Sequence, residues 1–118
     1  MKTQQKKKSI PPAGADARAM VEDIIKCKWS LTVLELIARG TNRPGAMVHA
    51  VEGLTTKVLN ERLTKLQRYG ILDRRVFPEK PPRVEYRFTA LGVKFLGVLE
   101  AINDLQRDIG VESEPVQA

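Results

Sequence analysis

A short run of small polar side chains lies near the middle of this 118-residue sequence. The residues from Thr55 to Asn60 offer hydroxyl, ammonium and amide groups, which can donate and accept hydrogen bonds at the edges of base pairs. The major groove of DNA, about 12 Å wide, admits a helix that carries such groups. Lys65 and Arg68 follow on the same side, where they suit contacts with phosphates. The predicted DNA-binding set on this segment comprises Thr55, Thr56, Lys57, Asn60, Glu61, Thr64, Lys65 and Arg68.

The element that must position these groups is a helix with one apolar side. Leu59, Leu63 and Leu66 fall within roughly 60° of one another around a helix axis, so one stripe can face a core while the polar side faces outward. Thr55 is the expected N-cap, because its hydroxyl can accept a hydrogen bond from an N–H group of the first turn. Gly70 is expected to end the helix.

Three helices are expected before this one. Apolar residues recur at helical spacing over residues 16–26, with Asp16 as the N-cap. The next helix, with Ser30 as its expected cap, is apolar almost all round and should therefore be buried. A short helix over residues 46–53 and a tight turn then lead into the polar helix. This order predicts a helix-turn-helix, in which the second helix enters the major groove with its N-terminal residues leading.

A β hairpin should follow the polar helix. Residues 71–77 and 83–88 are two short β segments, and alternate residues of the second should face the core. Three prolines in the five-residue connection make it stiff and unable to pair within a sheet. Such a hairpin can reach a neighbouring groove or the DNA backbone. The remaining predicted DNA contacts are Lys80 and Arg83 in the hairpin and Arg43 before the short helix.

The positive charge is localised rather than spread over the chain. The formal net charge is +6, and residues 55–87 carry nine basic and four acidic residues. Residues 1–18 carry five basic and one acidic residue, whereas residues 88–118 carry two basic and five acidic residues. A localised positive field predicts a polyanionic partner, and double-stranded DNA agrees with the helical motif.

One domain is expected from the length. Residues 1–15 are predicted to be a disordered basic tail, residues 16–109 a single folded domain, and residues 110–118 a second disordered tail. The fold class is mainly α with a small β hairpin (α+β), that is, a winged helix-turn-helix. Its last helix, capped by Thr89 and running to about residue 109, carries apolar residues spaced 4, 3, 4, 3 and 4 apart. That spacing predicts a coiled-coil-like dimer seam of Leu91, Phe95, Val98, Ile102, Leu105 and Ile109.

Three segments resemble the HxlR-type transcriptional regulators, a winged-helix family near the MarR-like proteins. They read "CKWSLTVLELIARG", "GLTTKVLNERLTKLQRYGILDR" and "YGILDRRVFPEKPPRVEYRFTALG", and the likeness spans about residues 20–105. The resemblance implies a homodimeric, DNA-binding regulator, more often a repressor, with dimer contacts from both terminal helices. In this chain the first helix would contribute Met20 and Ile24. Residues 26–28, Lys-Cys-Lys, depart from the glycines that commonly precede the family's Lys-Trp pair.

The cysteine and histidine side chains leave few alternative functions open. Cys27 lies between Lys26 and Lys28, and neighbouring positive charge favours the thiolate. It is therefore either a redox or electrophile sensor or an ordinary half-buried cysteine. His49 has no second ligand at metal spacing, so it is expected at the surface, with no metal site and no cofactor. No catalytic constellation is present, so an enzyme is not expected.

Location and partners follow from the same features. No apolar run is long enough to span a membrane, no signal peptide is evident and the single cysteine excludes an internal disulfide, which together predict the cytoplasm. The alternative function is a winged-helix module that binds an acidic protein instead of selecting DNA. The sequence identifies no inducer, whether a small molecule or an electrophile.

Overall fold

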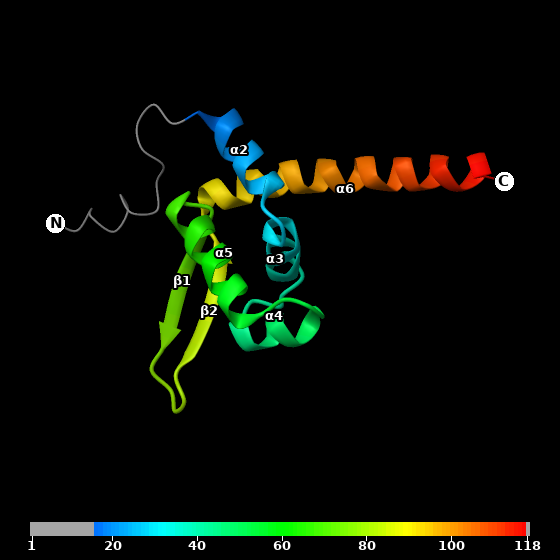
Figure 1. Cartoon of the computed structure of the whole chain (residues 1–118). Helices are drawn as coiled ribbons and strands as arrows, with labels where there is room; N and C mark the ends of the chain where they lie inside the picture. The colour runs from blue at the N-terminus through cyan, green and yellow to red at the C-terminus, as the bar shows by residue number, and fades with distance from the viewer. Residues whose placement is uncertain (1–15, 118) are drawn as a thin grey trace.

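Five helices and one β hairpin make up the part of the chain that the structure describes (Figure 1). The computed structural model describes residues 16–117, with side chains through residue 110. This architecture confirms the predicted fold class, and the predicted tail over residues 1–15 lies outside the described residues. The elements are α2 (Ala17–Lys26), α3 (Ser30–Ala38), α4 (Pro44–Ala50), α5 (Thr56–Arg68), β1 (Leu72–Phe77), β2 (Arg83–Phe88) and α6 (Ala90–Gln117).

Every element contributes to one hydrophobic core. Leu59, Leu63 and Leu66 of α5 are fully buried, as is Ile24 of α2. Burial of a leucine or isoleucine side chain stabilises the folded state by about 1.5–3 kcal/mol, so these contacts fix how α5 lies on the other helices. The other core residues are Val33, Leu34, Leu36, Ile37, Met47, Leu54, Ile71, Leu72, Tyr86, Phe95 and Leu99.

Local capping determines where α5 begins and ends. The Thr55 hydroxyl accepts a hydrogen bond of 3.2 Å from the Val58 N–H, which confirms the predicted N-cap. At the other end Gly70 has φ 80°, a left-handed conformation that costs glycine little. Its N–H donates to the Gln67 carbonyl at 2.9 Å, so the chain leaves the helix sharply toward β1.

The start of α3 differs from the prediction. The N-cap is Trp29, in a left-handed conformation with φ 79°, and Ser30 is the first helical residue. The Ser30 N–H donates to the Cys27 carbonyl at 3.1 Å, and the Ser30 hydroxyl is buried with no hydrogen-bond partner among the described residues. The Trp29 ring packs against the core and lies beside Gly53 in the turn before α5, so it anchors the chain there.

The hairpin pairs as expected. β1 and β2 are antiparallel, with Leu72 opposite Phe88 and Phe77 opposite Arg83. Tyr86 is buried, and Val84 and Phe88 pack against the core, which confirms that this side of β2 faces inward. The Tyr86 N–H also donates to the Asn42 carbonyl at 2.9 Å, so the loop before α4 adheres to β2. The far end of the hairpin projects from the helical body (Figure 1).

A threonine and a glycine fix the start of α6 against β1. The Thr89 hydroxyl accepts a hydrogen bond of 2.9 Å from the Gly92 N–H, as expected of a cap, and it donates to the Gly70 carbonyl. Gly92 is buried, and a Cβ atom there would lie 2.1 Å from the Ile71 carbonyl oxygen. This close approach requires glycine.

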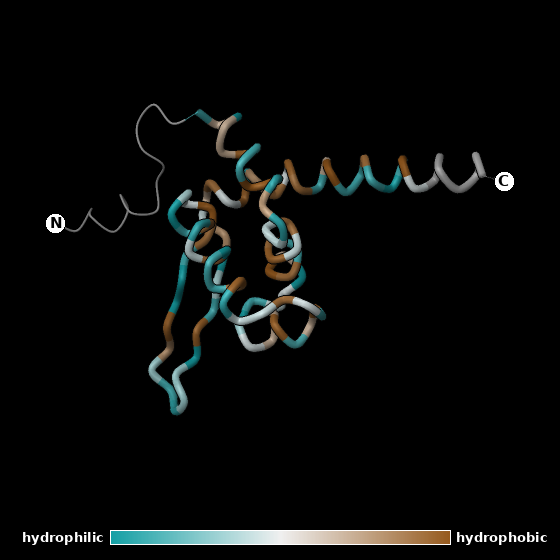
Figure 2. The backbone as a smooth tube through the Cα atoms, in the orientation of Figure 1, coloured by the Kyte–Doolittle hydropathy of each residue, from teal (hydrophilic) through white to brown (hydrophobic). Residues whose placement is uncertain are grey.

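α6 is longer than the sequence predicted. Instead of ending near residue 109 it continues to Gln117. One glycine inside a helix, here Gly110, costs only about 1 kcal/mol relative to alanine, and it does not stop the helix. Figure 1 shows that the second half of α6 extends beyond the helical body, and Figure 2 shows apolar and polar residues alternating along the coloured part of that helix.

Gly92→Ala should destabilise the protein, because the added methyl group collides with a backbone oxygen that cannot rotate away. We expect a loss of about 1–3 kcal/mol, as for overpacked cores. Gly97→Ala is the matched control, since nothing lies within 4 Å of a Cβ atom there. In that exposed helical position alanine should raise stability by about 0.5–1 kcal/mol. Urea unfolding monitored by circular dichroism measures both, and equal effects of the two variants would contradict the assignment.

Candidate nucleic-acid interface

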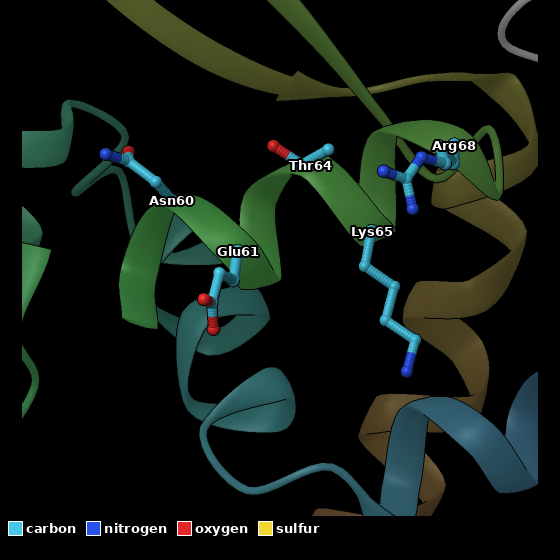
Figure 3. A pocket seen from close by; sticks show the side chains of 5 residues that line it. All are labelled: Asn60, Glu61, Thr64, Lys65 and Arg68. Carbon is cyan, nitrogen blue, oxygen red and sulfur yellow. The ribbon is translucent and has the colours of Figure 1, made fainter. Parts of the chain in front are cut away.

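The outer side of α5 presents polar side chains around a shallow hollow. Asn60, Glu61, Thr64, Lys65 and Arg68 line it, and Figure 3 shows them projecting from successive turns of the helix. Three leucines hold the opposite side of α5 in the core. The hollow thus brings together five of the eight DNA-binding residues predicted on this segment.

The leading end of α5 is open to solvent. Thr55, Thr56, Lys57 and Asn60 are all exposed, as a helix that enters a groove requires. On the side facing α3, the Arg62 guanidinium donates a hydrogen bond of 2.8 Å to the Lys28 carbonyl. Arg62 therefore ties α5 to the turn before α3. Lys57 and Arg68 make no ion pair with any residue of the described chain, so their charges remain available.

Lys65 is placed differently from the prediction of a phosphate contact. Its side chain extends away from Thr64 and toward α2 (Figure 3). Its Nζ lies 2.9 Å from the Asp23 Oδ1 atom and 2.9 Å from the Cys27 Sγ atom. The Tyr69 hydroxyl donates to the other oxygen of Asp23. We name these four residues the α2–α5 polar cluster.

The contacts within the α2–α5 polar cluster shift its protonation equilibria. The hydrogen bond from Tyr69, followed by that from Lys65, lowers the pKa of Asp23. Hydrogen bonds to Cys27 and then to Asp23 raise the pKa of Lys65. The hydrogen bond to Asp23 also raises the pKa of Tyr69. At neutral pH the cluster therefore contains a charged carboxylate, a charged ammonium group and a neutral phenol.

Glu85 organises the charges of the hairpin. Its carboxylate lies 3.7 Å from Arg43, 3.4 Å from Arg83 and 3.4 Å from Arg87. The Glu85 side chain is only 15% exposed, so these pairs are partly shielded from water. Alternation along β2 implies that Glu85 points away from the core, but it gives no signal of this role.

Two predicted DNA contacts are consequently engaged within the protein. Arg43 pairs with Glu85, and Arg83 pairs with both Glu85 and Glu79. The Arg83 guanidinium also lies 4.0 Å from the centre of the Phe77 ring, a cation–π contact within the hairpin. Lys80, by contrast, is exposed near the tip and makes no ion pair among the described residues. Of the hairpin cations predicted to contact DNA, Lys80 is the one whose charge is open to a partner.

The predicted dimer residues divide into three groups by their exposure: buried, partly buried and exposed. Ile24 and Phe95 are 0% and 4% exposed within the protomer, so they have no surface left for a partner, and this corrects their assignment. The apolar residues of the seam recur at regular spacing along α6, but those in the first half of the helix pack against the core of their own protomer. Met20, Leu91, Val98 and Ile102 are partly buried, whereas Leu105 and Ile109 are exposed. Ile25 and Val93, which the seam did not include, are exposed too.

The positions of His49 and Cys27 agree with the alternatives that the sequence left open. His49 is exposed, as predicted. Cys27 is half-buried, and its role as a redox or electrophile sensor stays a prediction. Within the described residues, no three His, Cys, Asp or Glu side chains gather in a metal-binding arrangement. No helix in that part of the chain is long and apolar enough to cross a membrane.

A short helix, a tight turn and an exposed polar helix followed by a β hairpin define a winged helix-turn-helix protein. Residues 24–114 match the HxlR-like helix-turn-helix family, and the chain belongs to that family. It is a family of transcriptional regulators that bind DNA.

Relatives and solved structures agree with this placement. The chain is 43% identical over 88 residues to the HTH-type transcriptional regulator sll1512 of Synechocystis, and the match covers 75% of this chain and 65% of the relative. It is similar to the crystal structure of a MarR-family transcriptional regulator from Enterococcus faecalis, with TM-score 0.70, 28% identity and coverage of 86% and 96%. It also resembles the redox regulator HypR in its reduced form, with TM-score 0.70, 25% identity and coverage of 83% and 99%.

The stability of the protein should fall in acid partly through Asp23. Because its folded-state pKa is lowered, its contribution is present above the ordinary carboxyl pKa of about 3.9 and is lost as pH falls through the folded value. Asp23→Asn should therefore flatten the dependence of unfolding free energy on pH below about 4. Urea unfolding at a series of pH values measures this. Glu22→Gln is the control, and an equal flattening in both variants would contradict the role of the α2–α5 polar cluster.

Proposed function

We propose that the chain is a sequence-specific DNA-binding transcriptional regulator that acts as a homodimer on an inverted-repeat operator. The observation that carries the proposal is the exposed polar side of α5, held outward by three fully buried leucines. A helix of 13 residues is about 20 Å long, which suits insertion of its leading turns into a major groove.

The contacts of α5 would divide between bases and phosphates. Thr56 and Asn60, near the leading end, carry the short hydroxyl and amide groups that suit base edges. Arg68 at the far end and Lys80 on the hairpin carry unpaired charges that suit phosphates, which orient a protein without reading sequence. Repression as the sign of regulation, and the cytoplasm as the location, follow from the family and belong to the same proposal.

The homodimer would form through the outer part of α6. Leu105 is 59% exposed and Ile109 is 46% exposed, on a segment that leaves the helical body (Figure 1). A second copy packed there would cover apolar surface and give the assembly two-fold symmetry. Two α5 helices would then address half-sites about 10–10.5 bp apart, one turn of the double helix.

Arg68→Ala should weaken binding to operator and random DNA alike, and should reduce the slope of log affinity against log salt by about 0.9 for each phosphate that the variant no longer neutralises. Asn60→Ala should instead change base preference, with a loss of about 1–3 kcal/mol on the operator for a good base contact. Gel-shift titrations at two salt concentrations, with an operator recovered from genomic fragments, measure both effects.

The control for these variants is Arg39→Ala, which removes an exposed charge beside the groove between α3 and α6, away from α5. It should leave binding close to that of the unaltered protein. If Asn60→Ala and Arg68→Ala have the same effect on every DNA, the division between base and phosphate contacts is wrong. If the protein retains no fragment selectively, it is instead a winged-helix module for an acidic protein partner.

Leu105→Glu should shift the protein toward monomer and weaken operator binding, because a charge would lie in an apolar contact. Arg107→Glu, which alters an exposed position on the opposite side of α6, is the control and should leave the dimer intact if the seam faces the partner. Sedimentation equilibrium over a range of concentrations measures the association. A dimer that survives Leu105→Glu unchanged would place the interface elsewhere.

A further inference from the structure

Lys65 lies on the outer side of α5, but its ammonium group is already engaged by other groups of the same protein. It lines the same hollow as Thr64 and Arg68, yet its ammonium group lies at hydrogen-bond distance from Asp23 of α2. The Asp23 and Lys65 side chains are 29% and 27% exposed. The Arg18–Glu22 pair, on the outer side of α2, is 85% and 66% exposed and is therefore screened by water. The partly buried pair should persist more of the time.

Both oxygens of Asp23 are engaged with α5 or its C-cap. Oδ1 accepts from Lys65, while Oδ2 accepts from the hydroxyl of Tyr69, the C-cap residue. The Lys65 ammonium group has a second neighbour at 2.9 Å in the Cys27 sulfur. The carboxylate cannot follow Lys65 outward without breaking its hydrogen bond with the Tyr69 hydroxyl. A phosphate could recruit Lys65 only by disrupting this arrangement.

We propose that Asp23 is a positioning residue that restrains Lys65 and so limits sequence-independent binding to DNA. The proposal rests on the proposed function of DNA binding. Each cation that reaches a phosphate releases counterions and strengthens binding to any sequence, operator or not. Holding one such cation against α2 lowers that common contribution while the base-reading end of α5 is unchanged. Because this contribution is common to operator and random DNA, the restraint lowers the affinity for both, and the ratio between them remains set by the base-reading end of α5.

Release of the restraint should add a phosphate contact. In Asp23→Asn the amide cannot hold an ammonium group as a carboxylate does, and the lysine stem can rotate toward Arg68. We expect random-DNA affinity to rise severalfold at low salt and the slope of log affinity against log salt to steepen by about 0.9 per protomer. Lys65→Ala alone should leave that slope unchanged, and Asp23→Asn with Lys65→Ala should return to it.

Glu22→Gln is the matched control, since it removes the same charge from the neighbouring residue of α2 without touching Lys65. Its effect on the slope should be small. A steeper slope that persists in the Asp23→Asn, Lys65→Ala double variant would overturn the proposal, because the cause would be general charge. Weaker random-DNA binding in Asp23→Asn, or a slope reduced by Lys65→Ala as it is by Arg68→Ala, would also overturn it. In that last case the proposed function would stand, because DNA binding would remain with Lys65 as one of its contacts.

A measurement on the unaltered protein tests the proposal without any variant. Acetylation of lysine amines, read by mass spectrometry with and without random duplex DNA, reports which amines the duplex covers. Lys57 and Lys80 should be protected by DNA, whereas Lys65 should react slowly in both states and show no added protection. Strong protection of Lys65 by DNA would overturn the proposal. Protection of no lysine would instead contradict the proposed function itself.

Discussion

The orientation of the polar surface of α5 depends on the burial of three leucines on the other side of that helix. Leu59, Leu63 and Leu66 have no exposed surface, and each would lose a transfer free energy of about 1.5–3 kcal/mol if the helix rotated to bring it into water. The side chains on the opposite face are therefore held outward by the core, whatever their own chemistry. A surface of hydroxyl, amide and charged groups is maintained at a defined orientation because the apolar stripe leaves the helix no other stable rotation.

Features that depend on neighbours in the sequence could be predicted. Thr55 caps α5 through an N–H three residues away, Thr89 caps α6 in the same manner, and alternation along β2 places Tyr86 in the core. The cap of α3 could not be predicted, because Ser30 has a capping side chain but its backbone is already helical behind a left-handed Trp29. That turn depends on where the Trp29 ring packs, next to Gly53, and no local pattern specifies this.

The charged part of the candidate interface was less predictable than its shape. Asp23 and Lys65 are 42 residues apart, and Arg43 is equally far from Glu85, so spacing gives no signal that they pair. A helical wheel places Lys65 beside Thr64 and Arg68, yet the length of the lysine stem lets its ammonium group reach another helix. The assignment of Phe95 to the dimer seam of α6 was wrong for a related reason: periodicity identifies the apolar side of the helix but cannot divide it between the protomer's own core and a partner.

The number of basic side chains therefore overstates the positive charge near α5 that is available to a partner. Residues 55–87 contain nine basic side chains, and Lys65, Arg75, Arg83 and Arg87 each pair with a carboxylate, while Arg62 binds a backbone carbonyl. Because paired cations release fewer counterions on binding a polyanion, these contacts reduce the part of DNA affinity that is independent of sequence. The same contacts join α2 to α5 and the loop before α4 to the hairpin. Internal ion pairing thus orients the elements of the interface and moderates its attraction for DNA, which leaves the hydroxyl and amide groups of α5 a larger share of the total DNA affinity.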